Sequence, residues 1–228
     1  MTLYQYPLQT ALKRVIPKTR IYDGASVSTA LRDRFVREVD QITWAHKLAP
    51  ETLNLPATSA VPEIQVFRVT LKGDALHDDV LRAIDRAVPF PIVFELLAGE
   101  HIQTAAAYKR PSEAERGKWV LSDHLHGDWV AQDSPRKPLP VAVNLGALYD
   151  GMLSALMPIT PVPGEDVETR LERLAAIRAK EREIAQLQSK LKRESQFNIK
   201  VTLHGQLAEA QAAFDHMKDP NKAGRGKP

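Results

Sequence analysis

The sequence contains no cysteine, which excludes disulfide bonds, thiolate metal ligands and a thiol nucleophile. It has no apolar run approaching the ~20 residues that a helix needs to cross a bilayer. The start of the chain lacks the charged and then apolar pattern of a secretory signal. From these absences we expect a cytoplasmic protein in a reducing compartment, without a membrane partner.

Glycine is sparse and scattered along the chain. The 11 glycines form neither the phosphate loop G-x-x-x-x-G-K-[ST] nor the dinucleotide fingerprint G-x-G-x-x-G. The nucleophile elbow G-x-S-x-G of serine hydrolases is also missing. We therefore expect no bound cofactor and no serine-hydrolase chemistry.

The residues that are present have an ordinary globular composition. Of the 228 residues, 43% are hydrophobic and 26% are charged, which is enough apolar material for one domain with a core and an attachment. Residues 1–60 hold 8 Lys and Arg against 5 Asp and Glu, residues 61–164 hold 10 against 13, and residues 165–228 hold 13 against 10. The basic character therefore lies at the two ends, where it permits contact with nucleic acid.

A basic segment near the N-terminus has two interpretations. It carries Lys13, Arg14, Lys18 and Arg20 around Pro17. One interpretation is an edge strand that the proline and the cations protect from further pairing. The other is an arm that contacts the phosphates of DNA, because each such contact releases counterions. These four cations are the candidate nucleic-acid-binding residues.

A helical pattern follows the basic segment. Apolar residues recur at intervals of four, four and three, which predicts a helix from Ser26 to about Lys47. Ser26 or Ser28 is expected to cap its start. We interpret Trp44 and His46 near its end as packing residues rather than as a site.

Residues 64–109 form the central block, in which strand and helix patterns alternate. We predict an interior strand at 64–72, a helix at 77–88 and two hairpin strands at 92–98 and 101–109, joined by Gly99 and Glu100. Three polar residues of the helix are expected to face solvent: Arg82, Asp85 and Arg86. Further along, short strands are predicted at 118–121 and 128–132, and Asn144 is expected to cap a helix that ends at Met157.

The last third of the chain changes in composition and period. Residues 158–164 hold three prolines and a glycine, which predicts a linker. Beyond it, two apolar stripes repeat at helical spacing, but they lie about 120° out of phase on one straight helix. Residues 165–217 are therefore predicted to form an antiparallel helical hairpin, with one continuous rod as the alternative, and residues 218–228 a disordered tail. The stripes supply the candidate partner-binding residues Leu171, Leu174, Leu187, Leu191, Leu207 and Phe214.

Together these patterns predict an α+β fold. Residues 1–157 are expected to form a small, mostly antiparallel sheet with packed helices. A coiled-coil-like helical arm is expected to follow it.

Two sets of residues are candidates for chemistry. His124 and His126 are two apart, so on an extended segment they point the same way, and Asp128 could join them as a metal ligand. The alternative is a polar turn whose side chains face water. Glu95 and Lys109 are the candidates for a metal-dependent nuclease, although no strand carries the E-x-K spacing that such enzymes use. An outer-face position in the hairpin is the alternative for Glu95.

Four segments of the chain are recognisable, at Val15–Lys18 (VIPK), Ile42–Asn54 (ITWAHKLAPETLN), Arg82–Ile92 (RAIDRAVPFPI) and Gln196–Asn198 (QFN). Together they resemble an uncharacterised bacterial family of about this length, known as a domain of unknown function. The resemblance implies genes beside type III-like restriction helicases and DNA methyltransferases, and thus a link with phage defence. It implies no catalytic residues.

Three functional hypotheses result from these observations. The first is a non-enzymatic accessory subunit of a bacterial DNA-targeting defence or restriction system, docking through its helical arm onto a helicase-type or methyltransferase partner. The second is a metal-dependent nuclease or other hydrolase. The third is a homodimeric coiled-coil structural protein.

Overall fold

The computed structural model describes residues 2–112, 114–115 and 118–218. The chain forms two compact units, Met1–Leu156 and Met157–Pro228, which we call unit 1 and unit 2 and describe separately. Unit 1 combines a mixed sheet with helices, and helices follow it in the chain, so the predicted α+β fold class is confirmed. Apart from Lys218, the predicted disordered tail lies outside the described residues.

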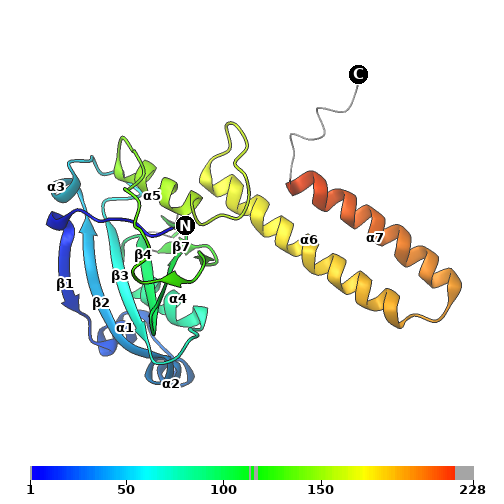
Figure 1. The fold of residues 1–228 in the computed structure, drawn as a ribbon, viewed down its shortest axis with the longest axis horizontal. Helices are drawn as coiled ribbons and strands as arrows, with labels where there is room; N and C mark the ends of the chain where they lie inside the picture. Colours follow the sequence, from blue (N-terminus) through cyan, green and yellow to red (C-terminus); the bar gives the residue numbers. More distant parts are fainter. Residues whose placement is uncertain (1, 113, 116–117, 219–228) are drawn as a thin grey trace. The chain divides into compact units, whose positions relative to one another are not determined.

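A seven-stranded sheet organises unit 1 (Figure 1). Its order is β1-β2-β3-β4-β5-β8, and β9 also pairs with β5. All pairs are antiparallel except β3 with β4, which are parallel and joined through α4. The strands are β1 (Ala11–Val15), β2 (Val39–Leu48), β3 (Ile64–Leu71), β4 (Ile92–Ala98), β5 (His101–Ala106), β8 (Leu125–His126) and β9 (Val130–Ala131). A second, two-stranded sheet pairs β6 (Lys109–Pro111) with β7 (Trp119–Leu121).

The main core lies where α1 (Lys18–Ala25), α2 (Thr29–Glu38) and α4 (Asp78–Ala87) pack on the sheet. Ile21, Phe35 and Ile84 come from the three helices and meet buried residues of the strands there. As predicted, β3 is an interior strand, and α4 presents an apolar stripe to it. The remaining helices of unit 1 are η1 (Leu8–Thr10), α3 (Pro50–Leu53) and α5 (Leu145–Ser154).

The helix predicted from Ser26 to Lys47 is wrong in its second half. Ser28 caps α2 as expected, because its side chain accepts a hydrogen bond from the Leu31 N–H at 3.4 Å. However, α2 ends at Glu38, and the next ten residues form β2. Strand β2 lies between β1 and β3 and pairs with both. Val39 and Ile42, which have helical spacing in the sequence, are buried in this strand instead. Pairing within the sheet therefore overrides the local helical pattern.

The predicted hairpin and capping residues are found, with shorter elements than expected. Gly99, at φ 53°, turns β4 into β5, but β5 ends at Ala106, and Lys109 begins the second sheet instead. Asn144 caps α5 by accepting a hydrogen bond from the Ala147 N–H at 2.8 Å. The helix ends at Ser154 and gives way to a turn before Met157.

Shifts of register in β1 and β2 set which side chains share a face. The register shifts by one residue within β1, between Ala11 and Arg14, where Lys13 adopts the left-handed φ of 52°. The pairing of β2 with β3 shifts at two further points, between Val39 and Gln41 and between Trp44 and His46. As a result Arg14 lies opposite Trp44, and Trp44 lies opposite Phe67 of β3. Residues opposite one another in a sheet share a face, so these three side chains form a row that leads from the core to the sheet edge.

Unit 2 is a helical hairpin of α6 (Val167–Arg193) and α7 (Phe197–Lys218) (Figure 1). Asp166 caps α6 through the Thr169 N–H at 2.7 Å, and Glu194 accepts hydrogen bonds from the N–H groups of Ser195 and Gln196 at the turn. The helices run antiparallel, so the Arg173 guanidinium near the start of α6 donates to the carbonyl oxygen of Met217 at 3.3 Å. None of the described helices has the length and hydropathy that spanning a membrane requires.

Candidate functional site

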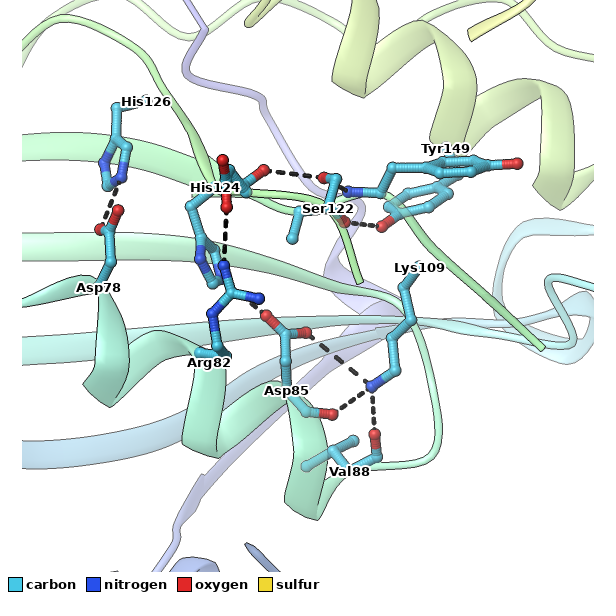
Figure 2. Close-up of polar contacts among 12 residues, drawn as sticks. Asp78, Arg82, Asp85, Val88, Lys109, Ser122, His124, His126 and Tyr149 are labelled. Atoms are coloured by element: carbon cyan, nitrogen blue, oxygen red, sulfur yellow. Dashed lines mark hydrogen bonds and ion pairs between the residues drawn. The ribbon is translucent and has the colours of Figure 1, made fainter. Parts of the chain in front are cut away.

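A polar face of α4 contacts the segment that leads into β8 (Figure 2). Asp78, Arg82 and Asp85 are spaced by four and three residues, so they lie on one side of the helix. Arg82 donates to Asp123 at 2.9 Å. The expectation that Asp85 faces solvent is wrong, since its side chain is 1% exposed. Asp85 lies four residues after the buried Leu81, and that spacing could have placed it on the inner side.

The buried part of this cluster joins Asp85 to His124 and Lys109. His124 Nε2 lies 2.8 Å from one carboxylate oxygen of Asp85, and Lys109 Nζ lies 3.9 Å from the other. Lys109 also donates to the carbonyl oxygens of Asp85 and Val88, where α4 ends. Burial lowers the pKa of Lys109 to about 8, while the Asp85 charge opposes that change. Lys109 thus caps the C-terminus of α4, where the negative end of the helix dipole favours a cation.

The two candidate metal-binding histidines share a side of the chain but do not share a partner. Both face α4, yet His126 Nε2 bonds to Asp78 at 3.0 Å while His124 bonds to Asp85, seven residues further along the helix. The hydrogen bond from His126 lowers the pKa of Asp78. Asp128 is exposed. Within residues 2–112, 114–115 and 118–218, no three His, Cys, Asp or Glu side chains gather in a way that could hold a metal ion.

Glu95 belongs to a separate ion-pair network. Its carboxylate accepts from Arg68 at 2.7 and 3.1 Å and from Arg136 at 2.6 Å, and its side chain is 1% exposed. The outer-face position considered for Glu95 is therefore wrong. Because Lys109 pairs with Asp85 instead, the fold places the two candidate catalytic residues in different networks, and both are buried.

Three of the four candidate nucleic-acid-binding residues lie in an open cavity or on the surface beside it, and the fourth, Lys18, turns inward. Arg14 and Arg20 are exposed and line a cavity of about 640 Å³ at the β1 edge of the sheet. Lys13 is exposed in the neighbouring bulge. Lys18 turns inward, where its Nζ donates to the Val39 carbonyl oxygen at 2.5 Å, and burial lowers its pKa.

Three aromatic rings form part of the cavity wall. Trp44, Phe67 and Phe90 line it together with the two arginines, and none of the described carboxylates lines it. The ring centroids of Trp44 and Phe67 are 6.3 Å apart. The sequence analysis did not identify Trp44 or Phe90 as site residues. Trp44 was assigned to a helix, and the sequence of the turn at Pro89–Pro91 does not indicate which part of the fold it contacts. We call these five residues and the space between them the Trp44 cavity.

The chain was also compared with known proteins. A family model described as a domain of unknown function (DUF4391) matches residues 5–214. The chain belongs to the DUF4391 family. Membership in a family of unknown function, which the sequence resemblance implied, is thereby confirmed. No curated protein and no solved structure matches the chain. The matched range includes the residues that line the Trp44 cavity, helix α4 and most of unit 2.

The predicted partner-binding residues lie along the helices of unit 2. Leu174 is buried, and five others are half-buried: Leu171, Leu187, Leu191, Leu207 and Phe214. Because α6 and α7 pack on each other, a large part of both stripes is already covered within the hairpin. The large apolar side chains of α7 that are exposed are different ones, at Phe197, Ile199 and Val201.

Proposed function

We propose that this DUF4391 protein is a non-enzymatic accessory subunit of a bacterial DNA-targeting defence or restriction system. In this proposal, unit 1 contacts nucleic acid and unit 2 docks onto a partner protein. A binding role is supported over a nuclease or other hydrolase because Glu95 and Lys109 are buried and already paired. A catalytic residue needs access to its substrate, which neither side chain has.

The Trp44 cavity carries the nucleic-acid part of the proposal. Arg14 and Arg20 come from different elements, β1 and α1, and converge on one open space, where no carboxylate in the described part of the chain lines the wall to neutralise them. Lys13 adds a third exposed cation beside them. Such a group favours a polyanion, whose phosphates displace counterions when cations bind them.

The test is binding of labelled DNA measured by fluorescence anisotropy over a range of salt concentrations. We expect affinity to fall steeply with salt, and Arg14→Ala/Arg20→Ala to reduce the slope of log K against log salt by about 2, since each lost phosphate contact removes about 1. Arg37→Ala/Arg182→Ala is the matched control, because both arginines are exposed and neither lines the cavity. Binding without any salt dependence would remove nucleic acid from the proposal.

The docking part of the proposal is supported by exposed apolar residues at the start of α7. Phe197 is 77% exposed and Val201 is 56% exposed. They are four residues apart, so they lie on the same side of the helix. Exposed aromatic and aliphatic residues of this kind anchor protein interfaces when a partner covers them. A helicase-type or methyltransferase protein is the partner we propose.

Docking is tested by co-purification with the products of adjacent genes. We expect Phe197→Ser/Val201→Ser to lose at least half of the recovered partner, while the control Ala208→Ser/Ala212→Ser, at exposed positions of the same helix, retains it. Equal recovery with both variants would contradict docking at this position. A dimeric mass in light scattering that Phe197→Ser/Val201→Ser converts to a monomeric mass would favour the homodimer instead.

A further inference from the structure

We propose that the Trp44 cavity holds an unpaired base of a single-stranded nucleic acid, stacked on the Trp44 indole, with adjacent phosphates on Arg14 and Arg20. The inference rests on the proposed nucleic-acid role and adds the class of ligand. It distinguishes a protein that stacks on exposed bases from one that contacts only the backbone of a duplex.

The shape and lining of the cavity favour a flat ring. Trp44 and Phe90 are each partly exposed, and Phe67 forms a buried wall behind them. At about 640 Å³ the space is within the range of roughly 300–1,000 Å³ in which proteins bind small ligands. Aromatic walls of this kind accept a base by stacking, because every base has a π face.

The hydrogen bonding of Trp44 determines how it can contact a ligand. Its indole N–H already donates to the His46 carbonyl oxygen at 3.0 Å. This bond and the packing against Phe67 fix the ring in place, so little side-chain freedom is lost when a ligand binds. The ring is left to interact through its face and its apolar edge. Stacking without a hydrogen-bond donor tolerates any base, so we expect little sequence preference.

The charges favour nucleic acid over an acidic peptide. Among the residues that the structure describes, the lining has two guanidinium groups and no carboxylate, so a ligand must bring negative charge close to its apolar part. Every nucleotide carries a phosphate next to its base, and Lys13 in β1 provides a cation for a further phosphate along the strand. A peptide supplies a carboxylate and a ring together only where its sequence happens to place them.

The position of the stacking ring favours single strands over duplexes. The bases of a duplex are covered by their neighbours above and below, and flipping one out costs a few kcal/mol. Trp44 lies behind the edge strand β1 in a concave space, and a ring there can meet only a base that has left the stack. A single strand exposes its bases without that cost.

The experiment compares a labelled oligothymidine of about 15 nucleotides with a duplex of the same length at one salt concentration. We expect the single strand to bind at least about tenfold more tightly. Trp44→Ala should weaken single-strand binding by roughly ten- to a hundredfold, since one stacked base is lost, whereas Trp44→Phe should largely restore it. Trp129→Ala is the control, because Trp129 is exposed and does not line the cavity.

A fluorescence measurement keeps the inference testable if Trp44→Ala fails to fold. In Trp119→Phe/Trp129→Phe, Trp44 is the only tryptophan, and stacking should quench its emission when oligothymidine is added. Duplex binding as tight as single-strand binding, with no quenching, overturns the stacking inference and leaves the backbone-contacting role in place. No binding of either DNA overturns both. Displacement of oligothymidine by polyglutamate at equal concentrations also overturns the inference, because the cavity is then an acidic-peptide site.

Discussion

At the scale of single residues, Lys109 shows how a buried charged side chain is held by partners within the fold. A lone buried cation is costly, but this one meets the carbonyl oxygens at the end of α4 and the carboxylate of Asp85. Its neighbour His124 bonds to the same carboxylate. The arrangement resembles the acid, base and cation of an active site, yet all three side chains are at most 1% exposed.

Replacing Lys109 by Met should reveal a pH-dependent cost of this burial. The pKa of Lys109 is about 8 in the folded protein against 10.5 without the fold, so between these values the unfolded chain binds more protons and stability rises with pH. From pH 8 to pH 9.5, the unfolding free energy of the wild type should therefore increase by about 1.5 kcal/mol relative to Lys109→Met. Urea unfolding of both proteins at the two pH values measures this. A difference that does not change with pH would contradict a charged, buried lysine.

At the scale of elements, a single close approach sets the distance between α1 and α4. A Cβ atom at Gly24 would lie 3.0 Å from the Ala87 Cβ atom, which is closer than most real contacts. Ala87 lines the Trp44 cavity, and so does Ile21 of α1. The packing of these two helices therefore supports one wall of the proposed site.

Gly24→Val should separate the two helices. We expect a loss of about 1–3 kcal/mol in unfolding free energy from overpacking, measured by urea unfolding. Gly73→Ala is the control, since a Cβ there would meet nothing within 4 Å, and its stability should stay near that of the wild type. Oligothymidine binding should weaken in Gly24→Val alone. Unchanged stability in both variants would show that α1 is not held against α4 at this distance.

The same scale explains what the sequence could and could not reveal. The α4 stripe, the Gly99 turn and the Asn144 cap depend on residues a few positions apart, and all three were predicted. The change from α2 to β2 depends on pairing with two other strands, which no local spacing contains. The site was found in part: Arg14 and Arg20 were candidates from charge alone, whereas Trp44 and Phe90 join them only through the register of β2 and the turn after α4.

At the scale of the whole molecule, the chain has two units of different construction. Unit 1 draws its core from strands and helices that are distant in sequence, while unit 2 is a hairpin of two consecutive helices. Contacts between neighbouring helices are local in sequence and need little loop closure, whereas the sheet of unit 1 must first bring together distant segments. We therefore expect unit 2 to fold faster than unit 1.

The bulge in β1 has a consequence for how unit 1 can meet other molecules. Between Ala11 and Arg14, β1 has one residue more than the paired segment of β2. Lys13 lies in this bulge and adopts a left-handed conformation. The outer edge of β1 therefore presents its N–H and C=O groups at irregular intervals, and a second strand cannot pair with it evenly. Assembly by extending the sheet is disfavoured at this edge, which leaves the side chains of β1 free to bind in its place.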